Sequence, residues 1–192
     1  MSRKLFAMSK TIGVVVLALA ALALAASWQG VGVRPDAEVL SRVVREVEGL
    51  DALRSTLATT FSGEPDRSTF ARVCQPVGAQ AKRLAEENGW TVQQLAEKYR
   101  NPGHQLDAEA ERIYRLMSAD PKLMGLWVRT EMEGASGSRY FRRIVVEAAC
   151  LACHGAKEGR PQFVKEGYPD DRAYGFQVGD LRGLYAVFVA DQ

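Results

Sequence analysis

The chain has little cysteine and little histidine, and charge of neither sign dominates it. Three cysteines in 192 residues are too few for the disulfide framework of a small secreted scaffold, and an odd number leaves one unpaired. The 25 basic and 23 acidic residues leave a formal net charge of +2. Because this balance is close to neutral, we predict no nucleic-acid partner.

One hydrophobic run is long enough to be a targeting or membrane segment. Residues 11–26 (TIGVVVLALAALALAA) follow a basic segment and precede a polar one, which is the order of an export signal. The run falls short of the roughly 20 residues that span a bilayer, but neighbouring residues can extend it to 5–26 as a retained anchor. We therefore predict a signal peptide or N-terminal inner-membrane anchor at 1–27, a linker at 28–36, and a periplasmic location for the rest.

Residues 37–192 are predicted to form one domain that begins with helices. Apolar residues recur every three or four positions from Leu40 to Leu57, which indicates a long amphipathic helix at the start of the domain. Further helical patterns and one turn follow. They are a helix that Ser68 caps, Pro76 kinks and Asn88-Gly89 ends, a short helix over 91–99, a turn at 101–103, and a helix over 107–117.

The second half of the domain has strand patterning. Segments rich in β-branched and aromatic residues predict strands at 126–132, 139–146 and 183–190, with a turn at 134–137 between the first two. Helices first and strands later are typical of an α+β fold with an antiparallel sheet.

The most specific motif lies between the second and third predicted strands. Cys150-Leu151-Ala152-Cys153-His154 has the C-x-x-C-H spacing of covalent c-type haem attachment. Two thiols three positions apart can each add to one vinyl group of the porphyrin, and the adjacent histidine then takes the proximal position on the iron. We predict one covalently attached haem c, which requires the cytochrome c maturation machinery.

Two other chemistries use the same residues. A thioredoxin-like dithiol needs a βαβ unit, which the predicted strand order lacks, and it leaves His154 unexplained. A structural zinc site needs four ligands, for which Cys74 and either histidine are available, but the motif crowds three donors into five residues. The spacing favours haem over both.

The residues alone leave the second axial ligand open. Cys74 has no disulfide partner once the motif cysteines are thioethers, although a free cysteine on an apolar helix face is usually a small hydrophobic residue. His104 lies in a polar turn, and three methionines are further candidates: Met117, Met124 and Met132. Ligation by a thiolate would favour ferric iron and lower the reduction potential.

Other polar residues are candidates for contact with the haem propionates, with local turn structure as the alternative role. Arg142 and Arg143 are neighbours on a predicted strand, so at most one of them faces the haem. Asp180 and Arg182 are expected to lock the loop before the last strand. The candidate propionate residues are Arg100, Asn101, Tyr168 and Arg172.

With these residues, the chain resembles the PAS-like c-type haem domain family over roughly residues 39–189. This family comprises exported single-domain cytochromes and the extracellular parts of some histidine kinases and chemoreceptors. The resemblance implies a PAS-like antiparallel sheet flanked by helices for residues 37–192. It rests on CLACHG at 150–155, YPDDRAYG at 168–175, GDLRG at 179–183, Arg100-Asn101-Pro102 and the helix around Cys74.

The resemblance also implies a His/Cys-ligated haem, with the thiolate from Cys74. The chain departs from the family pattern R-N-P-x-N by having His104 at the last position, so His104 stays as the alternative ligand. The predicted strand before the haem motif also lacks the proline common in the family.

We predict a sensor of redox state or of a small ligand, with a periplasmic electron-transfer cytochrome as the alternative. No nucleophile–base set, phosphate loop or paired-carboxylate pattern stands out, so we expect no enzymatic activity. No kinase or methyl-accepting segment follows the last predicted strand. We therefore expect a separate redox or signalling partner protein.

Overall fold

The computed structural model describes residues 33–61 and 63–192. The predicted signal peptide or anchor at 1–27, and most of the linker at 28–36, lie outside the described residues. Within the described ranges, no helix is both long enough and apolar enough to cross a membrane.

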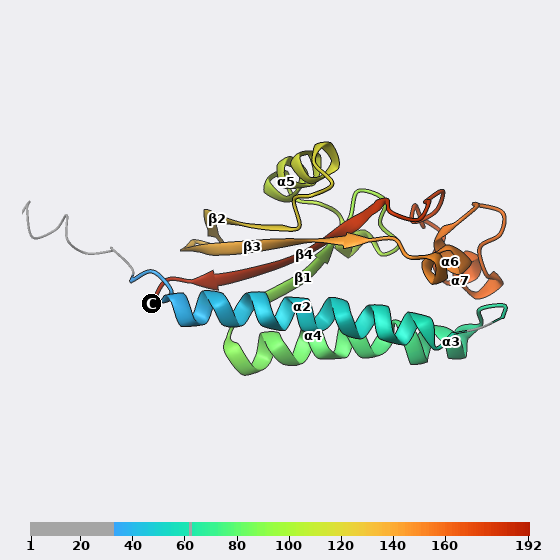
Figure 1. Ribbon diagram of the computed structural model, residues 1–192, viewed down its shortest axis with the longest axis horizontal. Coiled ribbons are helices and arrows are strands. Elements are labelled where there is room, and N and C mark those ends of the chain that lie inside the picture. The colour runs from blue at the N-terminus through green and yellow to red at the C-terminus, as the bar shows by residue number, and fades with distance from the viewer. Residues whose placement is uncertain (1–32, 62) are drawn as a thin grey trace, which may run out of the picture. The chain divides into compact units, whose positions relative to one another are not determined.

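A four-stranded antiparallel sheet forms the centre of the domain (Figure 1). The strands lie in the order β1-β4-β3-β2, so the last strand of the chain is inserted between β1 and β3. The predicted α+β class and antiparallel sheet are confirmed. The strands are β1 (Thr91–Leu95), β2 (Gly125–Met132), β3 (Ala135–Val145) and β4 (Leu181–Ala190).

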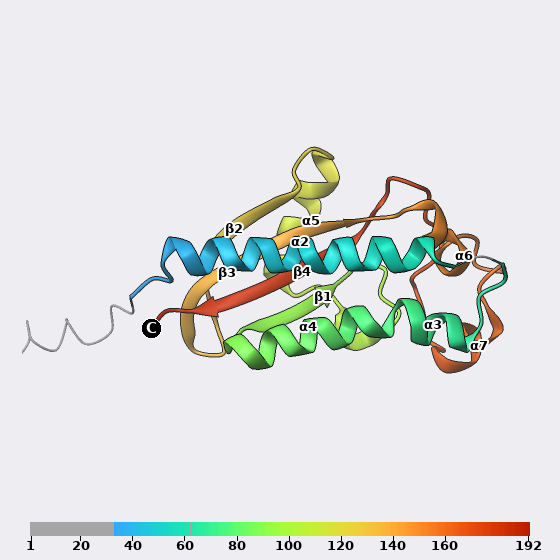
Figure 2. The same ribbon diagram turned by 60° about the horizontal axis from the view of Figure 1, so that its bottom comes forward.

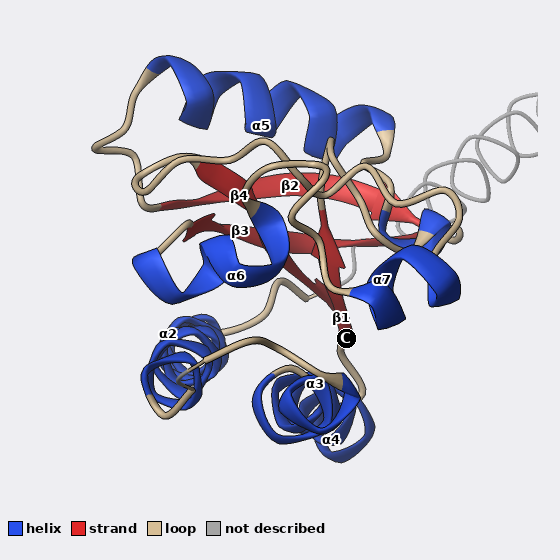
Figure 3. Ribbon diagram, turned by 90° about the vertical axis from the view of Figure 1, so that its right-hand side faces the viewer, coloured by secondary structure: helices blue, strands red, loops and turns tan. Residues whose placement is uncertain are grey.

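Helices cover both faces of this sheet (Figures 1 and 3). The covering helices are α2 (Ala37–Thr59), α3 (Arg67–Val73), α4 (Gln75–Asn88) and α5 (Ala108–Ala119). On one face α2 lies beside α4, and α3 leads into the start of α4, as Figure 2 also shows. The fourth helix, α5, covers the other face. The long N-terminal helix is confirmed.

Alternation along β4 creates one hydrophobic core on each face. Tyr185 and Val187 point to the α2–α4 side and pack with Val43, Val47 and Leu50 of α2. The residues between them point the other way. On the α5 side the buried cluster contains Leu184, Ala186, Phe141, Ile113 and Met117.

The helix predicted around Cys74 is two helices rather than one kinked helix. α3 ends at Val73 and α4 begins at Gln75, so Cys74 lies at the junction. Pro76 lies in the first turn of α4, where its missing N–H costs no hydrogen bond. The predicted stop is confirmed, because Gly89 ends α4 in the left-handed conformation.

The predicted cap of this segment was wrong by two residues. Asp66, not Ser68, caps α3, and its carboxylate accepts a hydrogen bond from the Thr69 N–H at 2.7 Å. The Thr69 hydroxyl accepts one from the Asp66 N–H, so the two residues form a reciprocal capping box.

The segment predicted as a short helix over 91–99 is instead strand β1. Thr91–Leu95 pairs with Leu184–Phe188 of β4 along its whole length. Pairing with a buried central strand outweighs the weak helical preference of the local sequence.

The turn between β2 and β3 is shorter than predicted. It consists of Glu133 and Gly134, both with positive φ (54° and 81°), which suits a two-residue hairpin loop. Residues 135–137 therefore already belong to β3. Gly137 fits there because a side chain would collide with the ring of Phe188.

The remaining elements are short and lie near the cysteine motif. The predicted turn at 101–103 is confirmed as part of a 3₁₀ turn, in which the Asn101 side chain accepts a hydrogen bond from the Gly103 N–H at 3.0 Å. The short elements are η1 (Pro102–His104), η2 (Ala148–Cys150), α6 (Leu151–His154) and α7 (Gln162–Gly167).

Candidate haem site

A cavity of about 520 Å³ lies between helices α2–α4 and the turn that carries the cysteine motif. This volume is in the range of pockets that hold a ligand of cofactor size, roughly 300–1,000 Å³. Much of the wall is apolar and includes Phe70, Val73, Val77, Leu95 and Ile144.

All three cysteines and both histidines of the chain line this one cavity. Cys150, Cys153 and His154 come from the η2–α6 turn, Cys74 comes from the α3–α4 junction, and His104 comes from η1. Segments far apart in the sequence thus bring every thiol and every imidazole of the chain to the same cavity.

The local fold of the motif explains its spacing. After β3 ends at Val145, the chain turns through η2 into the single helical turn α6. Residues three and four positions apart lie on the same face of a helical turn. Cys150, Cys153 and His154 therefore share one face, and all three are half-buried.

The His154 ring is held by the loop that follows α7. Its Nδ1 lies 2.7 Å from the carbonyl oxygen of Ala173, which can only accept a hydrogen bond. A neutral imidazole that donates from Nδ1 keeps its lone pair on Nε2 for a metal. Burial, with the nearby charges of Arg182 and Arg100, lowers the pKa of His154 to about 3 and so favours the neutral form.

Asp171 ties the same loop to the motif. Its buried carboxylate lies 3.3 Å from Arg100 Nε and 2.9 Å from Arg160 Nη1. Burial alone would raise the pKa of Asp171, but these partners and the Ala173 N–H lower it below its usual value. Arg100 Nη2 also donates to the Cys153 carbonyl at 2.9 Å. The sequence analysis did not single out this buried acid.

The two candidates for the second axial ligand both reach the cavity. Cys74 is exposed on one side, but the cavity wall around its thiol desolvates it and raises its pKa, and the neighbouring Cys153 adds to that effect. Burial lowers the pKa of His104, as does the charge of Arg182. The methionines named from the sequence, Met117, Met124 and Met132, do not line the cavity.

Most of the predicted propionate residues lie at the cavity. Arg100, Asn101 and Tyr168 line it. Arg172 does not line it; its side chain is exposed, and its guanidinium lies over the ring of Tyr99, a residue of the cavity wall, 5.0 Å from the centroid.

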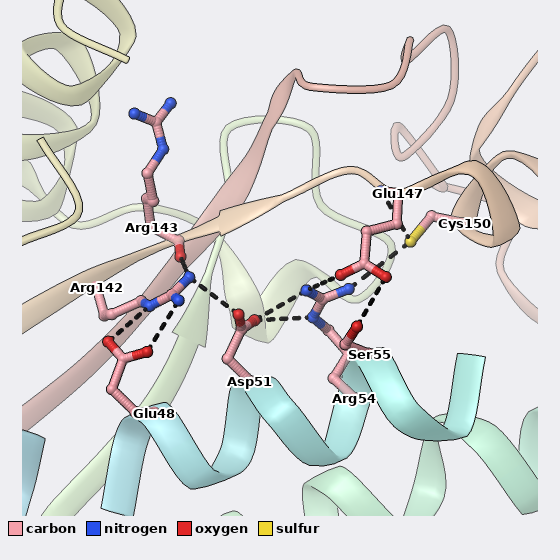
Figure 4. A network of polar contacts seen from close by, with 8 residues as sticks. All are labelled: Glu48, Asp51, Arg54, Ser55, Arg142, Arg143, Glu147 and Cys150. Atoms are coloured by element: carbon pink, nitrogen blue, oxygen red, sulfur yellow. Dashed lines mark hydrogen bonds and ion pairs between the residues drawn. The ribbon is translucent and has the colours of Figure 1, made fainter. Parts of the chain in front are cut away.

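The two strand arginines named from the sequence point to opposite faces, as strand geometry requires, and neither lines the cavity. Arg142 forms ion pairs with Glu48 and Asp51 of α2, both at 3.0 Å (Figure 4). Arg143 donates to main-chain carbonyls after α5, those of Asp120 at 3.2 Å and of Pro121.

Two arginines that the sequence analysis did not place at the site also line the cavity, Arg54 and Arg182. Arg54 donates to Asp51 at 2.9 Å, to Glu147 at 2.9 Å and to the Cys150 sulfur at 3.8 Å (Figure 4). Its position four residues after Leu50 continues the apolar face of α2, which was a usable signal. Arg182, predicted to lock the last loop, donates to the Lys98 carbonyl at 3.0 Å.

The structure gives the competing chemistries little support. The motif follows β3, but the next strand, β4, runs antiparallel to it, so no βαβ unit surrounds the two thiols. Within residues 33–61 and 63–192, no three His, Cys, Asp or Glu side chains are grouped so that they could hold a metal ion among themselves. A haem that supplies its own four nitrogen ligands needs only the two axial positions from the protein. The donors present therefore fit a haem.

Comparison with known proteins gives one family and one solved structure. The chain matches the Tll0287-like family over residues 33–190. The crystal structure of the cyanobacterial haem protein Tll0287 is 47% identical, covers 82% of this chain and 99% of its own, and superposes with a TM-score of 0.74. No curated protein matches the chain. The resemblance and the fold class predicted from the sequence are thereby confirmed, and the chain belongs to the Tll0287-like family.

Proposed function

We propose that the protein binds one haem c through Cys150 and Cys153, with His154 as the proximal iron ligand. The observation that carries this proposal is the gathering of both motif thiols and the His154 ring at one cavity of suitable size. In each attachment an S–H adds across a vinyl double bond, so a thioether forms and no atom leaves. The similar cyanobacterial protein Tll0287 is a haem protein, which supports haem binding by this chain.

Within the site, the chain holds His154 in its ligand form. The Ala173 carbonyl fixes the ring through Nδ1, and Asp171 fixes the loop that carries Ala173 through Arg100 and Arg160. When bound, a haem supplies one-electron redox chemistry and an iron atom that takes small ligands. We assign the second axial position to Cys74, which the family resemblance favours, with His104 as the alternative.

We propose a periplasmic sensor of redox state or of a small ligand, not an enzyme, that signals to a separate partner protein. The contacts of Cys150 support this role. The Cys150 sulfur and Glu147, three residues earlier, both contact Arg54 of α2. A displacement of the motif would therefore act directly on the long helix. A ligand change at the iron would then bias the position of α2. The periplasmic location follows from the N-terminal sequence.

An electron-transfer cytochrome is the second candidate. The observation that favours it is the partial exposure of all three motif residues, which would leave an edge of the bound group close to a redox partner. A carrier would keep both axial ligands through the redox cycle, whereas a sensor would exchange one.

Spectroscopy of the full-length protein made with the cytochrome c maturation machinery tests these assignments. We expect a covalent haem and a low-spin ferric thiolate signal that disappears in Cys74→Ala but persists in His104→Ala. The opposite pattern would assign bis-histidine ligation. Absence of covalent haem from the wild type would contradict the haem proposal itself.

The sensor and carrier proposals separate on the reduced protein. If the protein is a sensor, reduction followed by carbon monoxide or nitric oxide should replace the second axial ligand and change the absorption spectrum. A reduced spectrum that saturating gas leaves unchanged would favour the carrier.

A further inference from the structure

The charges around the cavity are unequal. Three arginines line it, whereas no aspartate or glutamate among the described residues does so. Arg54 is paired with Asp51 and Glu147, both at 2.9 Å. The remaining two, Arg100 and Arg182, are close enough for the charge of Arg100 to lower the pKa of Arg182.

Of these three, Arg182 has no carboxylate partner in the described part of the chain. Arg100 pairs with Asp171 at 3.3 Å, but Asp171 also pairs with Arg160 at 2.9 Å. One carboxylate is thus shared between two guanidinium groups. The hydrogen-bond acceptor of Arg182 in the described structure is a neutral group, the Lys98 carbonyl.

The surroundings of Arg182 make this missing partner costly. The side chain is half-buried, and its guanidinium lies 5.3 Å from the centroid of the Phe176 ring. Burial, followed by the charge of Arg100, lowers the pKa of Arg182 to about 10, although the charge of Asp171 acts more weakly in the opposite direction. A cation removed from water without a counter-ion destabilises the protein, and an anionic group on a ligand offsets that cost.

We infer that Arg182, with Arg100 beside it, binds a carboxylate of the molecule in the cavity, which for a haem is a propionate. A guanidinium presents two parallel N–H groups that match the two oxygens of a carboxylate. The inference rests on the proposed function, because it takes haem as the ligand. It assigns Arg182 a role in binding beyond the loop-locking role expected from the sequence.

The chain offers a matched control in Arg172. It lies ten residues before Arg182 and carries the same charge, but it stacks on Tyr99 and does not line the cavity. Arg182→Gln and Arg172→Gln therefore remove the same charge from neighbouring parts of the chain. Only the first removes it from the cavity.

The test uses the full-length chain made without the maturation machinery, so that no thioether forms and porphyrin binding is a reversible equilibrium. The cysteines are kept as free thiols. Each variant is titrated with hemin and with hemin dimethyl ester, which lacks the free carboxylates. We expect Arg182→Gln to weaken hemin binding by about ten- to a hundredfold, the effect of losing a charged hydrogen bond. Its affinity for the ester should stay unchanged, and Arg172→Gln should alter neither affinity.

Equal hemin affinity in Arg182→Gln and the wild type would overturn the inference and leave the proposed function standing. An equal loss for hemin and its ester would also overturn it, because Arg182 would then only shape the cavity. Failure of the wild type to bind either porphyrin would instead contradict the proposed function, and with it the inference.

Circular dichroism checks that the variants fold. If Arg182→Gln does not fold, the affinities of the wild type for hemin and for its dimethyl ester test the inference by themselves. Equal affinities for the two would overturn it.

Discussion

Arg54 of α2 forms an ion pair with Glu147, 2.9 Å long, where the chain leaves β3 and enters the cysteine motif (Figure 4). Ser55, the next residue of α2, donates to the other Glu147 oxygen at 3.0 Å. The Glu147 N–H in turn lies 3.4 Å from the Cys150 sulfur. The first thiol of the motif is therefore positioned from a helix almost a hundred residues away in the sequence.

Replacing Glu147 should measure what this connection contributes. In Glu147→Gln the ion pair to Arg54 is lost while the side-chain shape is kept. Because both side chains are partly exposed, we expect a modest loss of about 1 kcal/mol in the free energy of unfolding. Urea denaturation of the protein measures it.

The exposed pair of Lys82 and Glu86 on α4 provides the control. Glu86→Gln should change the stability by no more than about 0.5 kcal/mol, because an exposed pair on a helix contributes little. If Glu147→Gln costs no more than Glu86→Gln, the contact does not stabilise the motif.

Asp171→Asn should be much more damaging. The Asp171 side chain is fully buried, and its loss of charge leaves Arg100 and Arg160 facing each other without a counter-ion. We expect a loss of about 3 kcal/mol in the free energy of unfolding. Thermal denaturation should show a fall in Tm of about 9 °C for a chain of this size. A fall of only one or two degrees would mean that the loop does not depend on this carboxylate.

The same residue predicts a pH dependence. The folded-state pKa of Asp171 is lowered, so the unfolded chain takes up a proton first as the pH falls. Its stabilising effect is therefore complete above about pH 4, the value for an unperturbed aspartate, and is lost as the pH falls through the folded-state pKa. The stability difference between the wild type and Asp171→Asn should therefore narrow as the pH falls below about 4. A difference independent of pH would contradict this role.

Local signals in the sequence predicted the features that depend on near neighbours. The period of α2, the stop at Gly89 and the spacing of the cysteine motif are such features, and the structure places them as expected. β1 was mistaken for a helix because its conformation depends on pairing with β4, about 90 residues further on. Arg172 and Arg182 have similar local surroundings in the sequence. Arg182 reaches the cavity because it lies at the start of β4, which is inserted between β1 and β3.

Two glycines should respond to alanine in opposite directions. At Gly137 of β3 a Cβ would collide with the Phe188 ring and the Val189 carbonyl, so Gly137→Ala should destabilise the protein by about 1–3 kcal/mol. At Gly49 of α2 a Cβ has nothing within 4 Å, so Gly49→Ala should stabilise it by about 0.5–1 kcal/mol through helix propensity. Urea denaturation of both variants checks the pair, and a stabilising Gly137→Ala would contradict the tight packing of β3 on β4.

Arg182→Gln should lower the reduction potential of the haem-loaded protein. A cation beside the cavity disfavours the more positive ferric state, so its removal stabilises ferric iron relative to ferrous iron. Loss of the guanidinium would also leave a propionate without its counter-charge, and that effect has the same sign. Spectroelectrochemical titration measures the shift, with Arg172→Gln as the variant that loses the same charge at the surface. A higher potential in Arg182→Gln, or equal shifts in both variants, would show that Arg182 does not act on the haem from within the cavity.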